Sequence, residues 1–347
     1  MEMFSKYIIG YNKSIVAALE RLNSFNVEDS LTLFVVDELN RILGTITDGD
    51  IRRALVTGIT LEKSVSIVAN RSFYYIKADD YDVIQIKEAK KKGIELLPVL
   101  NEHMQLIDVV NFKIQKSYLP IDAVLMAGGK GERLRPLTEN TPKPLIKVGN
   151  KCIIDYNIDN LISYGVKCLN VTVNYLGEQI EKHFSELRNG VQVLTFREPK
   201  FLGTIGSIKF VDTFYNDYIL VMNSDLFTDI DFEDFFLYFR EHDADISVAA
   251  VPYNVNIPFG ILDLDGYNIK GLLEKPKYNY YANAGIYLMK KSVLNEIPKD
   301  TFFNATDLLE KLILQGKCVV RYPLKGTWID IGQHADLAKA RDLVKYV

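Results

Sequence analysis

The 347-residue sequence predicts a two-domain α/β protein, and three observations support this fold class. The length is about twice that of an ordinary domain. Apolar residues make up 48% and charged residues 25%, which is globular usage and excludes disorder and fibrous repeats. From residue 121 onward, strand patterns alternate with amphipathic helix patterns, as in sheets with parallel strands. We therefore expect a mixed sheet with helices on both faces over residues 119–347, preceded by a smaller α+β domain over residues 1–118.

The first domain carries an internal repeat. Leu31–Val36 and Ile42–Ile46 have strand patterns on either side of a polar turn, and Asp48–Val56 has a helix pattern. A weaker copy of the two strands and the turn follows about 64 residues later, which places Val36 on Leu100. The repeat predicts two similar units that pack together.

The first copy ends in Gly44-Thr45-Ile46-Thr47-Asp48-Gly49-Asp50, which resembles a CBS domain, so residues 1–118 resemble a CBS pair. The resemblance implies that Thr47 and Asp50 can contact an adenosine-type regulatory nucleotide. The second copy lacks these groups, because Asn111 and Ile114 stand at the matching positions. Capping of the following helix by Thr47 and Asp50 is the interpretation we favour. In that case the pair serves mainly dimerisation, and we expect a homo-oligomer.

Charge and cysteine content exclude several classes of function. The formal net charge is −4, which argues against nucleic-acid or membrane-surface binding. The three cysteines lie far apart and form no Cys-x-x-Cys pair, so neither a zinc knuckle nor a disulfide framework is indicated. No secretion signal and no run of about 20 apolar residues is present. We expect a cytoplasmic protein.

The second domain has strand and helix patterns in alternation. The expected strands are Ala123–Met126, Cys168–Val173, Gln192–Phe196 and Tyr218–Met222, and the expected helices between them include Ile153–Tyr164 and Gly177–Leu187. Further on, the sequence predicts a hairpin of Phe259–Leu264 and Ile269–Leu273 around Asp265–Asn268, and then a strand at Ala284–Met289. Ligands of such sheets bind beyond the carboxyl ends of the strands, so we look for chemistry in the loops after them.

The loop after the first of these strands has the composition of a phosphate site. It reads Ala127-Gly-Gly-Lys-Gly-Glu-Arg-Leu-Arg-Pro-Leu-Thr138, followed by Pro142-Lys143-Pro144. Glycines let the backbone approach a polyanion, and five cations stand against two carboxylates between Lys130 and Lys147. Neither a P-loop nor a dinucleotide fingerprint fits, because the latter needs a small residue where Leu134 stands.

This motif resembles the signature of the sugar-1-phosphate nucleotidyltransferases, and the resemblance extends over about residues 121–345. Later segments match in order: Asn174-Tyr175, Leu202-Gly-Thr204, Asn223-Ser-Asp225, Glu274-Lys-Pro276, Asn283-Ala-Gly285 and Trp328-Ile-Asp-Ile-Gly332. The resemblance implies a Rossmann-like, GT-A-like fold. It also implies transfer of a nucleoside monophosphate from a nucleoside triphosphate to a sugar 1-phosphate, with release of pyrophosphate.

The resemblance also implies roles for single residues. The catalytic cations would be Arg133, Lys143 and Lys275, and the carboxylates of Asp225 and Asp330 would bind Mg²⁺. The nucleotide would contact Gly128, Gly129, Gly131, Asn174, Gly203 and Thr204. The sugar would contact Gly260, Glu274, Asn283 and Gly285.

The substrates are expected from finer likenesses. Val173-Asn174-Tyr175 resembles guanylyltransferase relatives, which favours GTP over UTP, CTP or dTTP. The CBS pair favours glucosamine 1-phosphate, and a GDP-sugar for surface glycan or nonulosonic acid synthesis, with mannose or heptose 1-phosphate as alternatives. Asn304 and Ala305 depart from the Glu that many relatives carry nearby. The competing hypothesis is an inactive nucleotide sensor, which would not need to retain both metal carboxylates.

Overall fold

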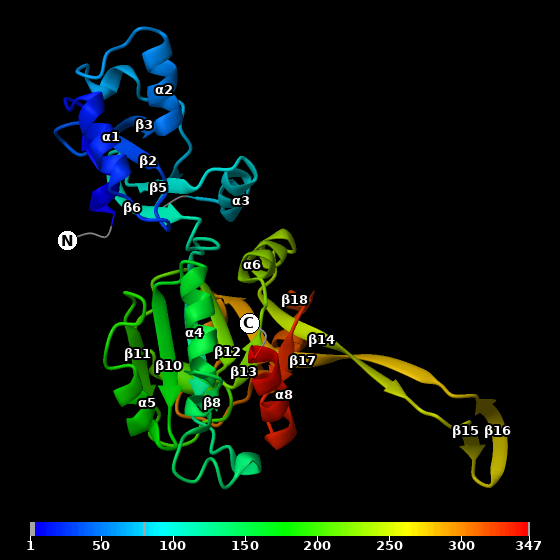
Figure 1. Cartoon of the computed structure of the whole chain (residues 1–347). Helices are drawn as coiled ribbons and strands as arrows, with labels where there is room; N and C mark the ends of the chain where they lie inside the picture. Colours follow the sequence, from blue (N-terminus) through cyan, green and yellow to red (C-terminus); the bar gives the residue numbers. More distant parts are fainter. Residues whose placement is uncertain (1–3, 79–80, 346–347) are drawn as a thin grey trace. The chain divides into compact units, whose positions relative to one another are not determined.

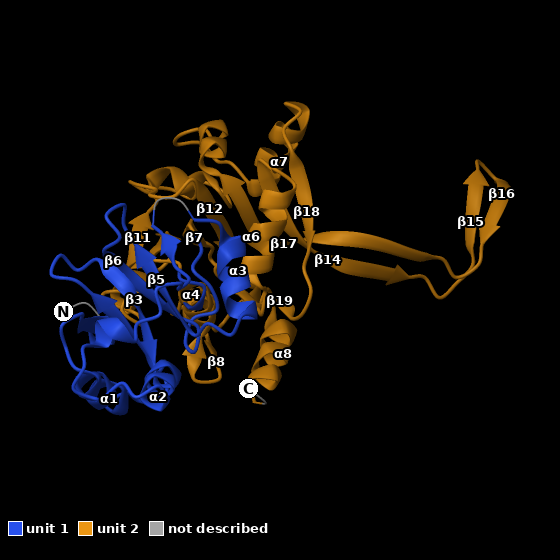
Figure 2. Cartoon of the chain, turned by 90° about the horizontal axis from the view of Figure 1, so that it is seen from above, with its two compact units in different colours: residues 1–119, 163–165 blue, residues 120–162, 166–347 orange. Residues whose placement is uncertain are grey.

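The structure is a computed structural model that describes residues 4–78 and 81–345. It contains two compact units, coloured separately in Figure 2. The first runs to Leu119 and includes Ser163–Gly165, and the second comprises Pro120–Ile162 and the chain from Val166 onward. No helix within the described residues is both long and apolar enough to cross a bilayer.

The first unit contains two three-stranded sheets with the same arrangement. In each, the middle strand is parallel to the first and antiparallel to the third. Leu33 and Val35 face one apolar cluster, and Phe34 between them faces another. The elements are β1 (Ile8–Gly10), α1 (Ile15–Asn23), β2 (Thr32–Val36), β3 (Ile42–Thr47), α2 (Asp48–Val56), β4 (Ile76–Lys77), α3 (Val83–Lys91), β5 (Leu96–Leu100) and β6 (Leu106–Asn111).

The repeat seen in the sequence is visible in the backbone. A bulge interrupts the first hairpin between Val35 and Val36, and the second hairpin has its bulge 64 positions later. Asn40 and Met104, at matching places in the two turns, both have positive φ, of 57° and 60°. Helix α2 has no counterpart among the described residues 112–119. The two copies therefore share strands and turns, and differ where the first copy has its capped helix.

The second unit is built on a mixed seven-stranded sheet in the order β11-β10-β7-β12-β17-β14-β18. The neighbours from β11 to β12 are parallel, and β17 then runs antiparallel to both β12 and β14. The strands are β7 (Ile121–Ala127), β10 (Cys168–Val173), β11 (Val193–Arg197), β12 (Tyr218–Asn223), β14 (Ile246–Asn256), β17 (Lys277–Lys290) and β18 (Val319–Pro323). The expected mixed α/β sheet is thus present.

Helices and short ladders complete the second unit. Leu308 and Leu312 of α7 belong to the same apolar cluster as Val221 of β12, while Leu337 of α8 shares a cluster with Leu134 of the glycine-rich loop. The helices are α4 (Ile153–Ser163), α5 (Gly177–His183), α6 (Phe232–Glu241), α7 (Ala305–Leu314) and α8 (His334–Val344). The short strands pair as β8 (Lys147–Val148) with β9 (Lys151–Cys152), and β13 (Leu226–Thr228) with β19 (Trp328–Asp330).

Two strands of the large sheet continue beyond it as an arm, which we define as residues 252–281. β14 and β17 stay paired as far as Asn256 and Lys277, and the hairpin of β15 (Ile261–Asp265) and β16 (Asn268–Leu273) follows. Figure 1 shows this arm projecting from the rest of the second unit. The sequence predicted the hairpin and its turn, but not the long ladder that carries it.

Candidate active site

Four neighbouring parallel strands end at one edge of the large sheet. They are β11, β10, β7 and β12, and the residues directly after them are Glu198, Asn174, Gly128 and Ser224. Strand β10 lies on one side of β7, and β12, which comes later in the chain, lies on its other side. The strand order therefore reverses at β7. Ligands of open α/β sheets bind at such a reversal, beyond the carboxyl ends of the strands.

The glycine-rich loop after β7 has a fixed shape. Gly131 has a φ of 62°, a left-handed conformation that glycine adopts without steric cost. Thr138 Oγ1 donates a hydrogen bond to the carbonyl oxygen of Gly131 at 2.9 Å. A Cβ at position 131 would lie 3.0 Å from Cβ of Lys143. The missing side chain therefore lets the loop pack directly against the segment that carries Lys143.

Lys143 is a buried cation between two carboxylates. It begins the 3-10 helix Lys143–Leu145, and its side chain is enclosed although it is charged. Its Nζ forms an ion pair with Asp225 and lies 3.9 Å from Oδ1 of Asp330. Lysine is rarely buried unless it is paired, so this contact accounts for its position.

Asp225 and Asp330 come together through the β13–β19 ladder. Leu226, which follows Asp225, is the register partner of Asp330, and the amide of Ile331 donates to the carbonyl oxygen of Asp225 at 3.2 Å. Burial and the negative charge of Asp225 raise the pKa of the Asp330 carboxyl, against the opposing effects of Lys143 and Arg133. The site thus holds two neighbouring carboxylates with the Lys143 cation between them.

Arg133 lies close enough to Asp330 to lower the pKa of its carboxyl. Leu134, the next residue, is fully buried against Ile331 and α8, which fixes the short helix Glu132–Leu134. The Arg133 guanidinium lies over Gly332, where a Cβ would be 3.1 Å from Nη2. The structure therefore brings together four predicted residues from distant parts of the sequence: Arg133, Lys143, Asp225 and Asp330.

Glu198 was missed by the sequence analysis and is the most informative addition. It is 4% exposed, and its Oε2 accepts a hydrogen bond from the amide of Leu202 at 3.1 Å. Its Oε1 lies against Gly128, so closely that a Cβ at position 128 would overlap it. Burial raises the pKa of the Glu198 carboxyl, which the Leu202 amide only partly offsets. Its place directly after a parallel strand was the signal that could have identified it.

A pocket of about 170 Å³ lies between these groups. The residues that line it include Gly128, Gly129, Glu198, Gly203, Thr204 and Asp225. Gly203 has a φ of 81° and leaves no room for a side chain. Thr204 Oγ1 accepts a hydrogen bond from the amide of Ala305 at 2.9 Å, so this hydroxyl also caps α7.

Three further predicted residues lie at the edges of this region. Asn174 packs beside Gly128. Asn283 donates to the hydroxyl of Tyr287 at 2.9 Å and accepts from the amide of Gly285 at 2.9 Å, so both ends of its amide group are used within the protein. Gly285, with a φ of 71°, lies against the side chain of Asn223 at the end of β12. These contacts shape the strand ends next to the pocket.

Gly260, Glu274 and Lys275 are not brought to the pocket within this chain. All three lie on the arm, where Gly260 packs against Glu274 and Lys275 Nζ is 3.9 Å from Glu274 Oε1. The side chains of Glu274 and Lys275 are both about two-thirds exposed, at 67% and 68%. The resemblance groups them with the other sugar and phosphate contacts, whereas the continuous β14–β17 ladder holds them away from the sheet.

Thr47 and Asp50 form a capping box at the start of α2. Thr47 accepts a hydrogen bond from the amide of Asp50, whose carboxylate accepts from the amide of Thr47 at 2.8 Å. The other Asp50 oxygen pairs with Arg53. Capping is therefore present, as the sequence interpretation favoured. Thr47 nevertheless also lines a larger pocket of about 470 Å³ within the first unit.

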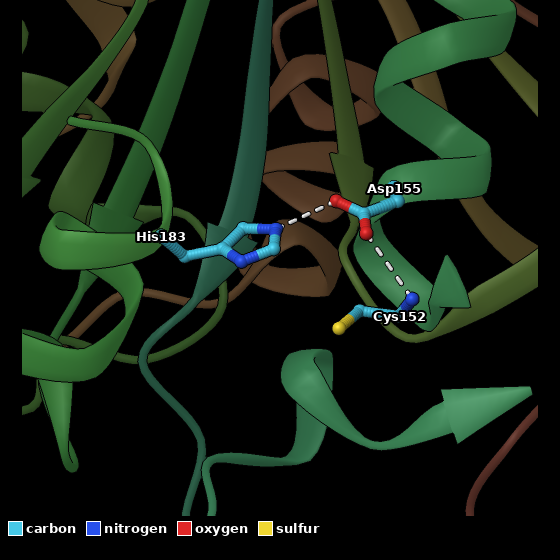
Figure 3. A group of neighbouring side chains, drawn as sticks. All are labelled: Cys152, Asp155 and His183. Atoms are coloured by element: carbon cyan, nitrogen blue, oxygen red, sulfur yellow. Dashed lines mark hydrogen bonds and ion pairs between the residues drawn. The ribbon is translucent and has the colours of Figure 1, made fainter. Parts of the chain in front are cut away.

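One cluster of possible metal ligands lies outside this site. Figure 3 shows Cys152, Asp155 and His183, whose ligand atoms lie within 4.8 Å of one another. His183 Nε2 is 2.7 Å from the Asp155 carboxylate, Arg188 is 2.9 Å from the same oxygen, and the amide of Cys152 donates to the other oxygen at 3.1 Å. The Asp155 charge is thus already compensated by protein groups, and the Arg188 cation opposes a metal ion there.

Comparison with known proteins identifies the family of the second unit. A family model described as "Nucleotidyl transferase" matches residues 122–345, well over half of the chain. The chain belongs to this family. A Sulfolobus acidocaldarius protein named as a candidate mannose-1-phosphate guanyltransferase is 32% identical over 220 residues, covering 62% of this chain and 61% of its own length.

Other relatives agree with this placement. The mannose-1-phosphate guanylyltransferase catalytic subunit beta of Drosophila pseudoobscura pseudoobscura is 30% identical, covering 62% of this chain and 60% of its own. The chain thus spans about three-fifths of the length of these relatives. The crystal structure of HddC from Yersinia pseudotuberculosis is 25% identical with a TM-score of 0.51, and the match covers 64% of this chain and 99% of HddC.

Proposed function

We propose that this nucleotidyl transferase joins a hexose 1-phosphate to the GMP part of GTP and releases pyrophosphate. A phosphate oxygen of the sugar attacks the α-phosphorus, and the bond from that phosphorus to the β-phosphate oxygen breaks. The sugar phosphate is already an anionic nucleophile at neutral pH, so positioning and charge shielding dominate the chemistry. Arg133 and Lys143 are the cations that shield the triphosphate.

The observation that carries the choice of GTP is the buried Glu198 carboxylate in the pocket. Guanine presents two adjacent donors, N1–H and the N2 amino group, to a single acceptor group. Uracil and thymine flank their one N–H with carbonyl oxygens, which an anionic carboxylate repels. In adenine and cytosine the amino group lies beside a ring nitrogen that accepts hydrogen bonds. An ionised carboxylate therefore favours guanine, both by attraction and by rejection of the other bases.

Asp225 and Asp330 fit Mg²⁺, since they are neighbouring carboxylate oxygen ligands. When bound, the ion would offset the charge that accumulates around the α-phosphate. Lys143, which pairs with Asp225, would then be free to exchange this contact for a phosphate oxygen. Asp225 and Asp330 are thus the proposed metal ligands, and Lys143 is the cation between metal and substrate.

For the sugar, the names of the relatives favour mannose 1-phosphate over our first expectation of glucosamine 1-phosphate. We therefore rank mannose 1-phosphate first, with heptose and glucosamine 1-phosphates as competitors. The test incubates the full chain and Mg²⁺ with each common nucleoside triphosphate and each sugar 1-phosphate and measures pyrophosphate. The proposal expects the fastest release with GTP and mannose 1-phosphate. Inactivity with every pair would overturn it and favour the nucleotide-sensor hypothesis.

We also propose that the first unit is a CBS pair and that it binds a regulatory adenosine-type nucleotide. The pocket of about 470 Å³ supports it, because polar and aromatic groups lie together there: Thr47, Lys92, Phe73 and Tyr74. Asp50 is not among the lining residues, so the Asp50 contact implied by the resemblance has no support here. Titration of the full chain with ATP and AMP tests the proposal. Binding that Lys92→Ala weakens supports a site in this pocket, and absence of binding leaves capping as the role of Thr47.

A further inference from the structure

The hairpin at the end of the arm has an apolar face that the chain does not cover. Leu262 pairs with Leu272 across the ladder, and Leu264 pairs with Ile269, so these four side chains lie on the same face. All four are exposed, at 49–62%. Alternation of apolar and polar residues is the pattern of a strand with one face against a core.

Such a hairpin is not expected to be stable while its apolar face is exposed to water. A two-stranded hairpin alone is marginally stable, and it needs a further strand, a helix or another surface on its apolar face. Further exposed apolar side chains occur elsewhere on the arm, at Tyr253, Phe259, Tyr280 and Tyr281. An exposed apolar face such as that of the hairpin marks a site of interaction.

The arm also carries charged residues with a defined geometry. Lys275 has a φ of 45°, which is uncommon for a residue with a side chain. This backbone conformation costs free energy, and such strain is often found at functional sites. Gly260 allows Glu274 to pack directly against the backbone beside it. The base of the hairpin is therefore arranged to present Glu274 and Lys275 together.

The lining of the second unit's pocket contains a single lysine and no arginine, and the arm carries another lysine. Among the residues that line it, Lys143 is the only lysine or arginine, and Lys143 is already paired with Asp225. A sugar 1-phosphate adds further negative charge to a site that must also hold a triphosphate. Lys275 is an exposed cation of suitable charge, but it lies on the arm.

A continuous ladder carries the arm out of the large sheet. Register partners run without interruption from Ala250 and Asn283 to Asn256 and Lys277, and this ladder continues β14 and β17 out of the large sheet. Bringing the arm back to its own pocket would require a sharp bend in this ladder or at the base of the hairpin. A second copy of the chain can instead receive the arm in its present conformation. When two copies exchange identical elements in this way, they form a closed dimer with twofold symmetry.

We propose that two copies exchange arms, so that each arm lays its apolar face on the other copy and brings Lys275 and Glu274 to that copy's pocket. The inference rests on the proposed function, because Lys275 would bind the sugar phosphate of the reaction. It differs from a simple dimer, since each active site would be incomplete without the second chain.

Two variants with different tags test the exchange when they are expressed together. Asp225→Asn inactivates the pocket but leaves the arm intact, and Lys275→Ala inactivates the arm but leaves the pocket intact. Each variant alone is expected to lose activity by about 10²-fold or more. The heterodimer, purified through both tags, would contain one site with a wild-type pocket and a wild-type arm. We expect it to have about half the activity of the wild-type dimer.

The remaining outcomes separate this proposal from the proposed function. Wild-type protein without pyrophosphate release contradicts the proposed function itself. If the wild type is active and the heterodimer is inactive, arm exchange is overturned. In that case each site is made within one chain, so each chain of the heterodimer carries a defective site. Failure to isolate a doubly tagged dimer, or full activity of Lys275→Ala, overturns it as well. Lys270→Ala is the matched control, since this exposed arm lysine pairs with Asp265 and should leave activity unchanged.

Discussion

The carboxylate of Glu198 lies directly against the backbone of Gly128, the first residue after the central strand β7. Any side chain at position 128 would overlap the Glu198 carboxylate where it now lies. The glycine of the signature motif thus has a second role besides approach to phosphate, because it makes room for the group that we propose reads the base.

Gly128→Ala is therefore expected to raise KM for GTP by at least 10-fold, because the added Cβ displaces Glu198 Oε1 from the pocket. Steady-state kinetics of pyrophosphate release would measure the effect. The control is Gly49→Ala in the first turn of α2, where the nearest atom to an added Cβ is 3.4 Å away. Unchanged GTP kinetics in Gly128→Ala would show that the carboxylate position is unimportant.

Glu198→Gln should change base preference while it stabilises the fold. Loss of a hydrogen bond to a charged acceptor lowers kcat/KM for GTP roughly 10- to 100-fold. Relief of a buried charge, which raises the carboxyl pKa in the wild type, should increase the melting temperature. Kinetics with GTP, ATP, UTP and CTP, together with a thermal melt, measure both effects. An unaltered preference for GTP would place the base elsewhere.

The same carboxyl predicts a pH dependence. Because its pKa is raised in the folded protein, Glu198 becomes protonated at a higher pH than an ordinary glutamate as the pH falls. KM for GTP should then increase over that acidic range, and less so in Glu198→Gln. The free energy of unfolding changes in the opposite direction, because the folded state binds the Glu198 proton more tightly than the unfolded state. The stabilisation from this proton is full below the ordinary glutamate pKa and is lost as the pH rises through the raised pKa of the folded protein. Titration of KM and of urea unfolding against pH would check both signs.

Local patterns allowed prediction of the fold class and of most strands, because the strands of the large sheet are short, almost continuously buried apolar runs and helix patterns separate them. The glycine-rich loop was predicted from its composition and its place directly after β7, whereas Lys143 and Asp225 were predicted from the resemblance to the family. The pairing of Asp225 with Asp330 was predicted only through the resemblance to the family, because spacing in the sequence does not show that the β13–β19 ladder joins these distant segments. The arm escaped prediction for a different reason: its alternating apolar residues predict a covered hairpin, and this chain leaves them exposed.

Asp225→Asn should nearly abolish turnover without unfolding the protein. The substitution removes a proposed metal ligand and the partner of Lys143, while the backbone contacts of the β13–β19 ladder remain. We expect a loss of about 10²- to 10³-fold in kcat, with an unchanged far-ultraviolet circular dichroism spectrum. Lys151→Ala, an exposed lysine paired with Asp159, is the control with normal activity. A normal rate in Asp225→Asn would remove this residue from the mechanism.

Thr47→Ala tests the balance between capping and ligand binding in the first unit. The hydroxyl of Thr47 satisfies the amide of Asp50 at the start of α2, so its removal should cost about 1 kcal/mol in the free energy of unfolding. Chemical denaturation of the full chain, followed by a probe specific to the first unit, would measure this loss. Thr57→Ala at the other end of the same helix is a useful comparison, since its hydroxyl only donates to the carbonyl oxygen of Ala54. If Thr47→Ala leaves stability unchanged and yet weakens binding of an adenosine-type nucleotide, the pocket and not the cap explains why threonine stands at this position.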